Sequence, residues 1–175
     1  MVKLIRLGVV GRSQSRMLEF FKSASFVDPQ LGELHRSHGT WRGTLKLDAE
    51  APVPLVLSGG RAAPDAEALR IAQSVPSDYA SWRLAIEREL FDHYSPYAEA
   101  VAAGELDAPS SGLPSIEAPS SVWGHTTLAF VQVTPLGGVL TVEIGYRVAW
   151  DEEHTLGARF RAGQLLELCG SVLAP

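Results

Sequence analysis

Side chains that could do chemistry are concentrated in five consecutive residues, Trp150-Asp151-Glu152-Glu153-His154. The stretch places three carboxylates next to one imidazole. A carboxylate beside an imidazole raises its pKa and orients the ring, an arrangement that serves acid–base catalysis or metal binding. On an extended backbone, Trp150, Glu152 and His154 point to one face, and Asp151 and Glu153 point to the other.

Three interpretations of this stretch remain open. It is structural if Asp151 or Glu153 accepts hydrogen bonds from turn N–H groups while Trp150 packs in the core. It is a binding surface if the five side chains contact a partner. It is an enzyme or metal site if the chemistry centres on His154 with Glu152 and Asp151.

The metal interpretation needs ligands from more than one element. Contiguous strand residues diverge, whereas zinc takes three or four ligands, normally drawn from separated elements. His125, on a neighbouring predicted strand, is the residue that His154 could recruit. We therefore expect no metal site, no cofactor and no catalytic set here.

Charge and cysteine content restrict the partners of the chain. Residues 1–25 contain five basic residues against Glu19, a balance of +4, which leaves −9 for the rest of a chain of net charge −5. An acidic body repels phosphate backbones, which disfavours nucleic-acid binding. No apolar run approaches the roughly 18 residues that cross a bilayer. The single cysteine, Cys169, fits a reducing compartment, and we expect it to be a small buried hydrophobe.

Periodicity predicts an α+β fold in which helices separate two groups of strands. The expected strands cover residues 26–34, 41–47, 53–57, 125–133, 139–150, 156–161 and 165–169. Two helices are expected between them, from Pro64 to a stop at Pro76 and from Ser77 to Ala103, because proline ends a helix. The second carries an apolar stripe at Trp82, Ile86, Leu90 and Tyr94.

These elements predict an antiparallel sheet, made of an N-terminal and a C-terminal β region, that is covered on one face by two helices. Residues 26–175 are expected to form a single α+β domain. Residues 1–25 are expected to be an N-terminal extension, partly disordered or helical, in which either Met1 or Met17 is the start of the protein.

The stretch from Trp150 to Gly157 resembles the W-D-x-E-H-x-x-G signature of a family of small uncharacterised bacterial proteins, which is grouped with immunity proteins of polymorphic toxin systems. The resemblance extends from Phe26 to Cys169 and includes the Trp41-Arg42-Gly43 strand. It implies a bacterial cytoplasmic protein that neutralises a toxin by binding it, and it implies no catalytic residues.

Charge and resemblance together favour a non-enzymatic binding module. Its acidic body would recognise a basic protein partner such as a toxin by charge complementarity. The residues expected to bind are Trp150, Asp151, Glu152, Glu153 and His154. The alternative is an enzyme or metal-binding protein centred on His154 with Glu152 and Asp151.

Deletion of residues 1–16 tests the predicted extension. The charge of this segment is opposite to that of the body and its apolar pattern is weak, so we expect the melting temperature to stay nearly unchanged. A thermal melt of the shortened chain beside the full chain measures this. A large fall would mean that the segment packs on the domain.

Overall fold

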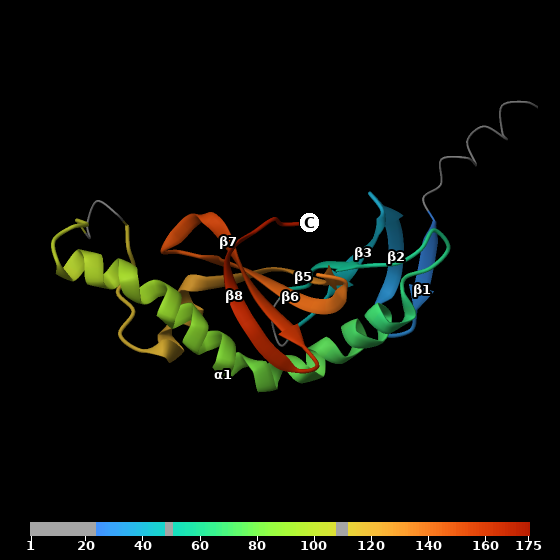
Figure 1. Ribbon diagram of the computed structural model, residues 1–175, viewed down its shortest axis with the longest axis horizontal. Helices are drawn as coiled ribbons and strands as arrows, with labels where there is room; N and C mark the ends of the chain where they lie inside the picture. The colour runs from blue at the N-terminus through green and yellow to red at the C-terminus, as the bar shows by residue number, and fades with distance from the viewer. Residues whose placement is uncertain (1–23, 48–50, 108–111) are drawn as a thin grey trace, which may run out of the picture.

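The computed structural model describes residues 24–47, 51–107 and 112–175. Nearly all of the predicted N-terminal extension therefore lies outside the described residues. Within the described residues, four strands precede a long helix and four follow it (Figure 1). The elements are β1 Ser25–Asp28, β2 Gly32–Ser37, β3 Thr40–Leu45, β4 Val53–Leu57, α1 Ala66–Ala102, η2 Pro119–His125, β5 Thr126–Leu136, β6 Val139–Val148, β7 Asp151–Arg161 and β8 Gln164–Val172.

All eight strands form one sheet in which their order follows the chain. Neighbouring strands are antiparallel, except that β4 and β5 are parallel, with Leu55 opposite Val131. The exception arises because α1 carries the chain back along the sheet before β5 begins, as a crossover between parallel strands must. The predicted α+β class and a mostly antiparallel sheet are confirmed, and the two predicted β regions join into one sheet at β4–β5.

The strand predicted over residues 26–34 is interrupted by a turn. The Asp28 carboxylate accepts hydrogen bonds from the backbone N–H groups of Gln30 and Leu31, both at 2.9 Å, and Gly32 has a positive φ of 74°. The other Asp28 oxygen accepts a 2.9 Å bond from Gln73 of α1. Burial opposes ionisation of this carboxylate, but the three hydrogen bonds outweigh it and lower the pKa of Asp28. The β1–β2 turn is therefore tied to the helix.

The described residues form two helices, but these are not the two that the sequence predicted. The predicted helices on either side of Pro76 are one continuous α-helix, α1, and the second helix is the 3₁₀-helix η2. The α1 helix begins after Pro64, where Asp65 caps it by accepting hydrogen bonds from the N–H groups of Glu67 and Ala68. Among the described residues, no helix is both long enough and apolar enough to cross a membrane.

Packing explains why Pro76 does not end α1. A proline inside a helix removes one hydrogen bond and costs about 3 kcal/mol. Near it, the hydroxyl of Ser74 donates to the carbonyl of Ile71 at 2.9 Å, and the hydroxyl of Ser77 donates to the carbonyl of Ser74 at 2.7 Å. Val75 and Tyr79, which flank the proline, are buried. Burial on both sides of the proline keeps the helix continuous and bowed along the sheet (Figure 1).

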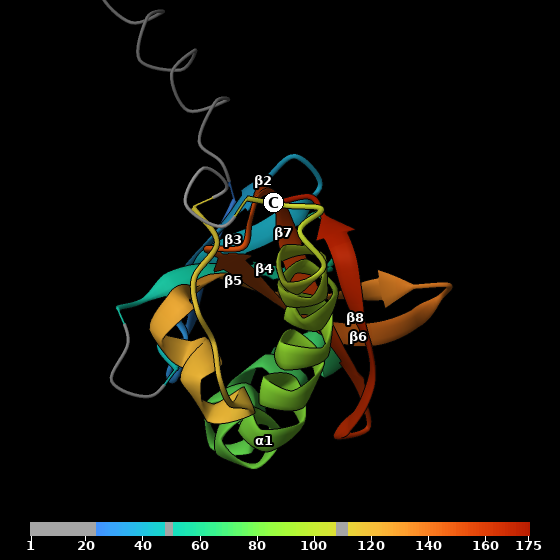
Figure 2. The same cartoon turned by 90° about the vertical axis from the view of Figure 1, so that its left-hand side faces the viewer.

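The core forms between α1 and the sheet, which curves around the helix in the view along its axis (Figure 2). Trp82 stacks on Phe160 of β7 with ring centroids 4.2 Å apart, and the Tyr146 hydroxyl of β6 bonds that of Tyr79 at 3.2 Å. The predicted apolar stripe is confirmed as a buried face. The buried residues of α1 are Ala68, Ala72, Val75, Tyr79, Trp82, Ile86, Leu90 and Tyr94.

The opposite face of the sheet carries a row of polar side chains that the pairing register places side by side. Gln132 of β5, Glu143 of β6, Arg159 of β7 and Glu167 of β8 are successive cross-strand partners. Glu143, which is 6% exposed, accepts bonds from Gln132 at 2.6 Å and from Arg159 at 2.5 Å. The guanidinium of Arg159 also binds Glu167 at 2.8 Å, so the buried carboxylate is held by a paired network.

Substitution Leu90→Ala tests the buried stripe. Leu90 is 0% exposed, so removal of its side chain should lower the free energy of unfolding by roughly 2–5 kcal/mol. Leu84→Ala is the matched control, because Leu84 lies on the same helix and is 56% exposed; we expect about 0.5 kcal/mol or less. Urea titration of the three proteins measures both values. A Leu90→Ala loss below about 1 kcal/mol would contradict the packing.

Candidate functional site

The stretch singled out in the sequence begins inside the protein. Trp150 ends the turn between β6 and β7 and is 5% exposed. Its indole N–H donates to Nδ1 of His93 on α1 at 3.1 Å, and its ring meets that of Tyr94 edge to face, with centroids 5.6 Å apart. Trp150 therefore anchors the turn to the helix.

Asp151 and His154 meet because β7 bulges. The register pairs Arg147 with Thr155 and Val148 with Asp151, so the three β7 residues in between have no partner on β6. A bulge of this kind interrupts the alternation of side chains along a strand. As a result, Nδ1 of His154 lies 2.8 Å from Oδ1 of Asp151. The expectation that these two side chains point to opposite faces is therefore wrong.

A tyrosine of α1 completes this cluster. The Tyr97 hydroxyl donates to Oδ2 of Asp151 at 3.3 Å, and its ring centroid lies 5.9 Å from that of His93. Burial opposes ionisation of Asp151, but the hydrogen bonds from His154 and Tyr97 outweigh it, so the pKa of Asp151 is lowered. Burial, with the nearby charge of Asp151, raises the pKa of Tyr97. The carboxylate is thus ionised and held from both sides.

His93 is the group in this cluster whose protonation is opposed by the fold. Burial lowers its pKa, although the charge of Asp151 acts in the opposite direction. Its Nδ1 accepts the hydrogen bond from Trp150, which requires that this nitrogen carry no proton. A protonated His93 would lose that bond, so the neutral imidazole is the form that fits the folded protein.

Glu152 and Glu153, unlike Trp150 and Asp151, are exposed. Glu152 lines a cavity of about 380 Å³ where the β6–β7 turn meets the start of β5. The other residues that line it are Gly124, His125, Thr126, Thr127, Arg147, Val148 and Ala149. The stretch is therefore divided: Trp150, Asp151 and His154 hold it in place, and the two glutamates project from it.

Chemistry at this site is limited by that division. A carboxylate that orients an imidazole, as Asp151 orients His154, can support acid–base catalysis by that imidazole. His125 lines the same cavity as Glu152, but His154 and Asp151 do not line it. Within residues 24–47, 51–107 and 112–175, no three histidine, cysteine or carboxylate residues are grouped so that they could hold a metal ion.

Sequence reasoning missed the helical half of the site. His93 and Tyr97 are four residues apart, so they share one side of α1 next to the predicted stripe. The sequence does contain a signal: a histidine and a tyrosine at this spacing place two polar groups along the edge of the apolar stripe. What the sequence lacks is any indication that the β6–β7 turn, which comes much later in the chain, packs against them.

Cys169 also differs from the expectation. It was predicted to be buried, but its side chain is only partly buried and lies beside Gly157 of the neighbouring strand. Its thiol is 3.4 Å from the carbonyl of Ser171. The apolar run around it belongs to β8, which is the last strand of the sheet and, among the described strands, pairs only with β7. The prediction of a buried thiol was therefore wrong.

Fold and site define an α+β protein in which a single helix anchors an acidic strand bulge. Residues 30–172 match the family model described as Domain of unknown function (DUF6985), and the chain therefore belongs to this family. No curated protein and no solved structure matches the chain significantly. The resemblance to immunity proteins stays a prediction.

The His93–Trp150 bond predicts a pH-dependent stability. The folded-state pKa of His93 is lowered, so below the ordinary histidine pKa of about 6.5 the unfolded chain binds the proton more readily. The free energy of unfolding should therefore fall as the pH decreases from about 7 through the lowered folded-state value. The variant His93→Gln keeps an acceptor for Trp150 and does not titrate. Urea titrations between pH 7.5 and 5 should show a shallower decline in the variant, and equal slopes would contradict this.

Proposed function

We propose that this protein is a non-enzymatic binding module that recognises a basic protein partner through one acidic end. The observation that carries the proposal is the exposure of Glu152 and Glu153 on a bulge whose neighbours are fixed to α1. Charges on a held backbone need little further ordering when a partner binds, which lowers the entropic cost of association.

The surroundings of the bulge have the same sign of charge. The C-terminal part of α1 and the β6–β7 turn lie at the same end of the molecule (Figure 1). In the described part of residues 88–153, two arginines, Arg88 and Arg147, are exposed against seven carboxylates. We call these carboxylates the acidic end: Asp92, Glu99, Glu105, Asp107, Glu117, Glu152 and Glu153. A surface with such an excess attracts cations and accelerates encounter with a basic partner.

A toxin-neutralising role in the bacterial cytoplasm is the finer form of this proposal. The lone cysteine fits a reducing compartment, and a basic nuclease-type toxin would be masked by an acidic surface. The alternative, an enzyme or metal protein centred on His154 with Glu152 and Asp151, has the Asp151–His154 pair in its favour. It has less support, because Glu152 is exposed and lines a cavity that the pair does not line.

Charge reversal at the acidic end tests the proposal. The probe is an immobilised nona-arginine peptide, and the matched variants are Glu153→Lys at the acidic end and Glu33→Lys on β2, which is also exposed. At about 20 mM salt we expect Glu153→Lys to weaken binding by roughly 5–10-fold and Glu33→Lys by less than about 2-fold, because only the first removes charge from the contact surface. Binding of the unaltered chain should weaken strongly at about 300 mM salt.

Two outcomes would contradict the proposal. Equal effects of the two variants would mean that net charge alone attracts the probe. Stoichiometric zinc in the purified protein, lost in His154→Ala, would favour the metal alternative. For the toxin-neutralising form, co-expression with basic nuclease toxin domains should restore growth with the unaltered chain and not with Glu153→Lys.

A further inference from the structure

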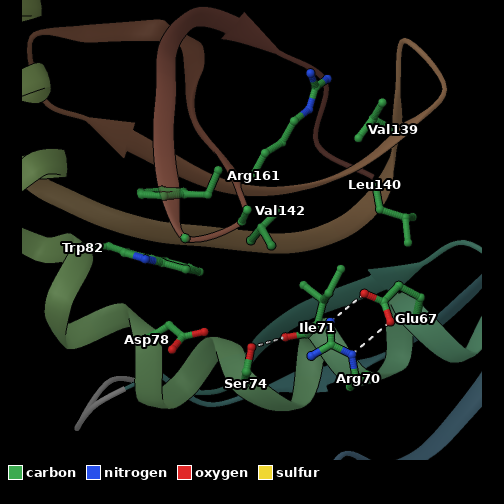
Figure 3. Close-up of a pocket in the computed structure, with 13 residues that line it drawn as sticks. Glu67, Arg70, Ile71, Ser74, Asp78, Trp82, Val139, Leu140, Val142 and Arg161 are labelled. Atoms are coloured by element: carbon green, nitrogen blue, oxygen red, sulfur yellow. Dashed lines mark hydrogen bonds and ion pairs between the residues drawn. The ribbon is translucent and has the colours of Figure 1, made fainter.

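A second candidate site lies on the other half of α1. A cavity of about 470 Å³ separates the first turns of the helix from the ends of β6 and β7 (Figure 3). This volume falls within the range of about 300–1,000 Å³ that is typical of ligand sites. The side chains that line it on the helix are Glu67, Arg70, Ile71, Ser74, Asp78 and Trp82.

The walls of this cleft are mainly apolar. Trp82 and Phe160, stacked at 4.2 Å and 16° to each other, form one end. Leu140 and Val142 of β6 face Ile71 of the helix across the space (Figure 3). One face of the indole is covered by Phe160, and Trp82 is only 6% exposed, so the cleft offers a firm apolar wall and no open aromatic face.

One charge in the cleft is unpaired. Asp78 lies one turn before Trp82 on α1, and its carboxylate is directed into the space beside the indole (Figure 3). In the part of the chain that the structure describes, no hydrogen bond or ion pair holds that carboxylate. Glu67, the other acid of the cleft, differs because Arg70 binds both of its oxygens, at 2.9 and 2.5 Å.

The remaining cation near the cleft does not neutralise Asp78. The guanidinium of Arg161 donates to the hydroxyl of Thr141 at 2.9 Å and to the carbonyl of Leu136 at 2.7 Å. Figure 3 shows its side chain leading away from the helix, toward the opposite face of the sheet. The cleft therefore combines an apolar wall with one carboxylate, that of Asp78, with which no cation of the described residues forms an ion pair.

We propose that this cleft binds an arginine side chain of the basic protein partner, an inference that rests on the proposed function. The guanidinium would pair with Asp78, since its planar donors match the two oxygens of a carboxylate. The methylene groups of the arginine would lie along Val142, Leu140 and Ile71, as the stems of long cationic side chains do on apolar surfaces. An anion is disfavoured by Asp78, and a neutral apolar group would bury that carboxylate without a partner.

The cleft and the acidic end can be tested separately because they are far apart. Tyr97, which holds the Asp151 bulge, lies several helical turns beyond Asp78 on the same continuous helix. Contact at both places requires a partner surface of protein size, and that is the class of partner already proposed. A single arginine on such a partner would act as the anchor of the interface.

The test is an NMR titration of the ¹⁵N-labelled full chain with N-acetyl-arginine-N-methylamide. We expect saturable shifts at millimolar concentration in the Trp82 indole N–H and in residues 71–82 and 139–142. Asp78→Asn should weaken the affinity at least about 5-fold, because it removes the charge that a guanidinium pairs with. Glu33→Gln is the matched control, because Glu33 is an exposed carboxylate on β2 outside both the cleft and the acidic end; it should leave the affinity unchanged. In the free Asp78→Asn protein, an unshifted indole N–H signal of Trp150, which bonds His93 outside the cleft, verifies the fold.

Three outcomes would overturn the proposal: equal binding of the uncharged norleucine analogue, equal affinity of Asp78→Asn and the unaltered chain, or shifts confined to the acidic end. The two proposals fail separately. If Glu153→Lys weakens nona-arginine binding while Asp78→Asn changes nothing in the titration, the arginine cleft is wrong and the acidic end stands. If the arginine derivative binds at Asp78 while Glu153→Lys and Glu33→Lys behave alike, the reverse holds.

Discussion

The stack of Trp82 on Phe160 sets where α1 lies on the sheet. Aromatic pairs of this kind contribute about 0.5–1.5 kcal/mol beyond the burial of their surface. One turn earlier, Tyr79 bonds Tyr146 of β6, so two neighbouring strands are held at adjacent turns of one helix. Both candidate sites depend on this position of the helix. Asp78 faces the cleft because Trp82 is fixed beside it. His93 and Tyr97 reach the β6–β7 turn because the helix continues in the same direction.

The helix and most strands could be predicted because they depend on local periodicity. The stripe from Trp82 to Tyr94 and the alternation in residues 41–47 are patterns that burial on one face imposes on a sequence. The break expected at Pro76 could not be corrected from the sequence, since the packing that outweighs the proline comes from distant strands. The strand expected over residues 26–34 was split by a side chain, Asp28, whose hydrogen bonds create the turn.

The candidate site was predicted in its residues but not in its geometry. Composition singled out residues 150–154, because carboxylates and an imidazole are rarely so dense in a short segment. The bulge and the contacts with His93 and Tyr97 divide these residues into two groups. Trp150, Asp151 and His154 hold the segment, and the two glutamates project from it. A bulge of this kind leaves no local pattern in the sequence. A contact between segments far apart in the chain leaves none either. The unpaired charge of Asp78 is hidden in the same way, since its surroundings come from three different elements.

The strand order has a consequence for how the chain reaches this structure. Every other pair of neighbouring strands is joined by a short connection, whereas β4 and β5 must find each other across the whole of α1 and η2. Loop-closure entropy makes such a distant pairing the slow one. We expect two sets of hairpins to form early and independently, and the parallel β4–β5 junction to form last, when α1 has already collapsed onto both. Chain synthesis reinforces this order, because the first four strands leave the ribosome well before β5 exists.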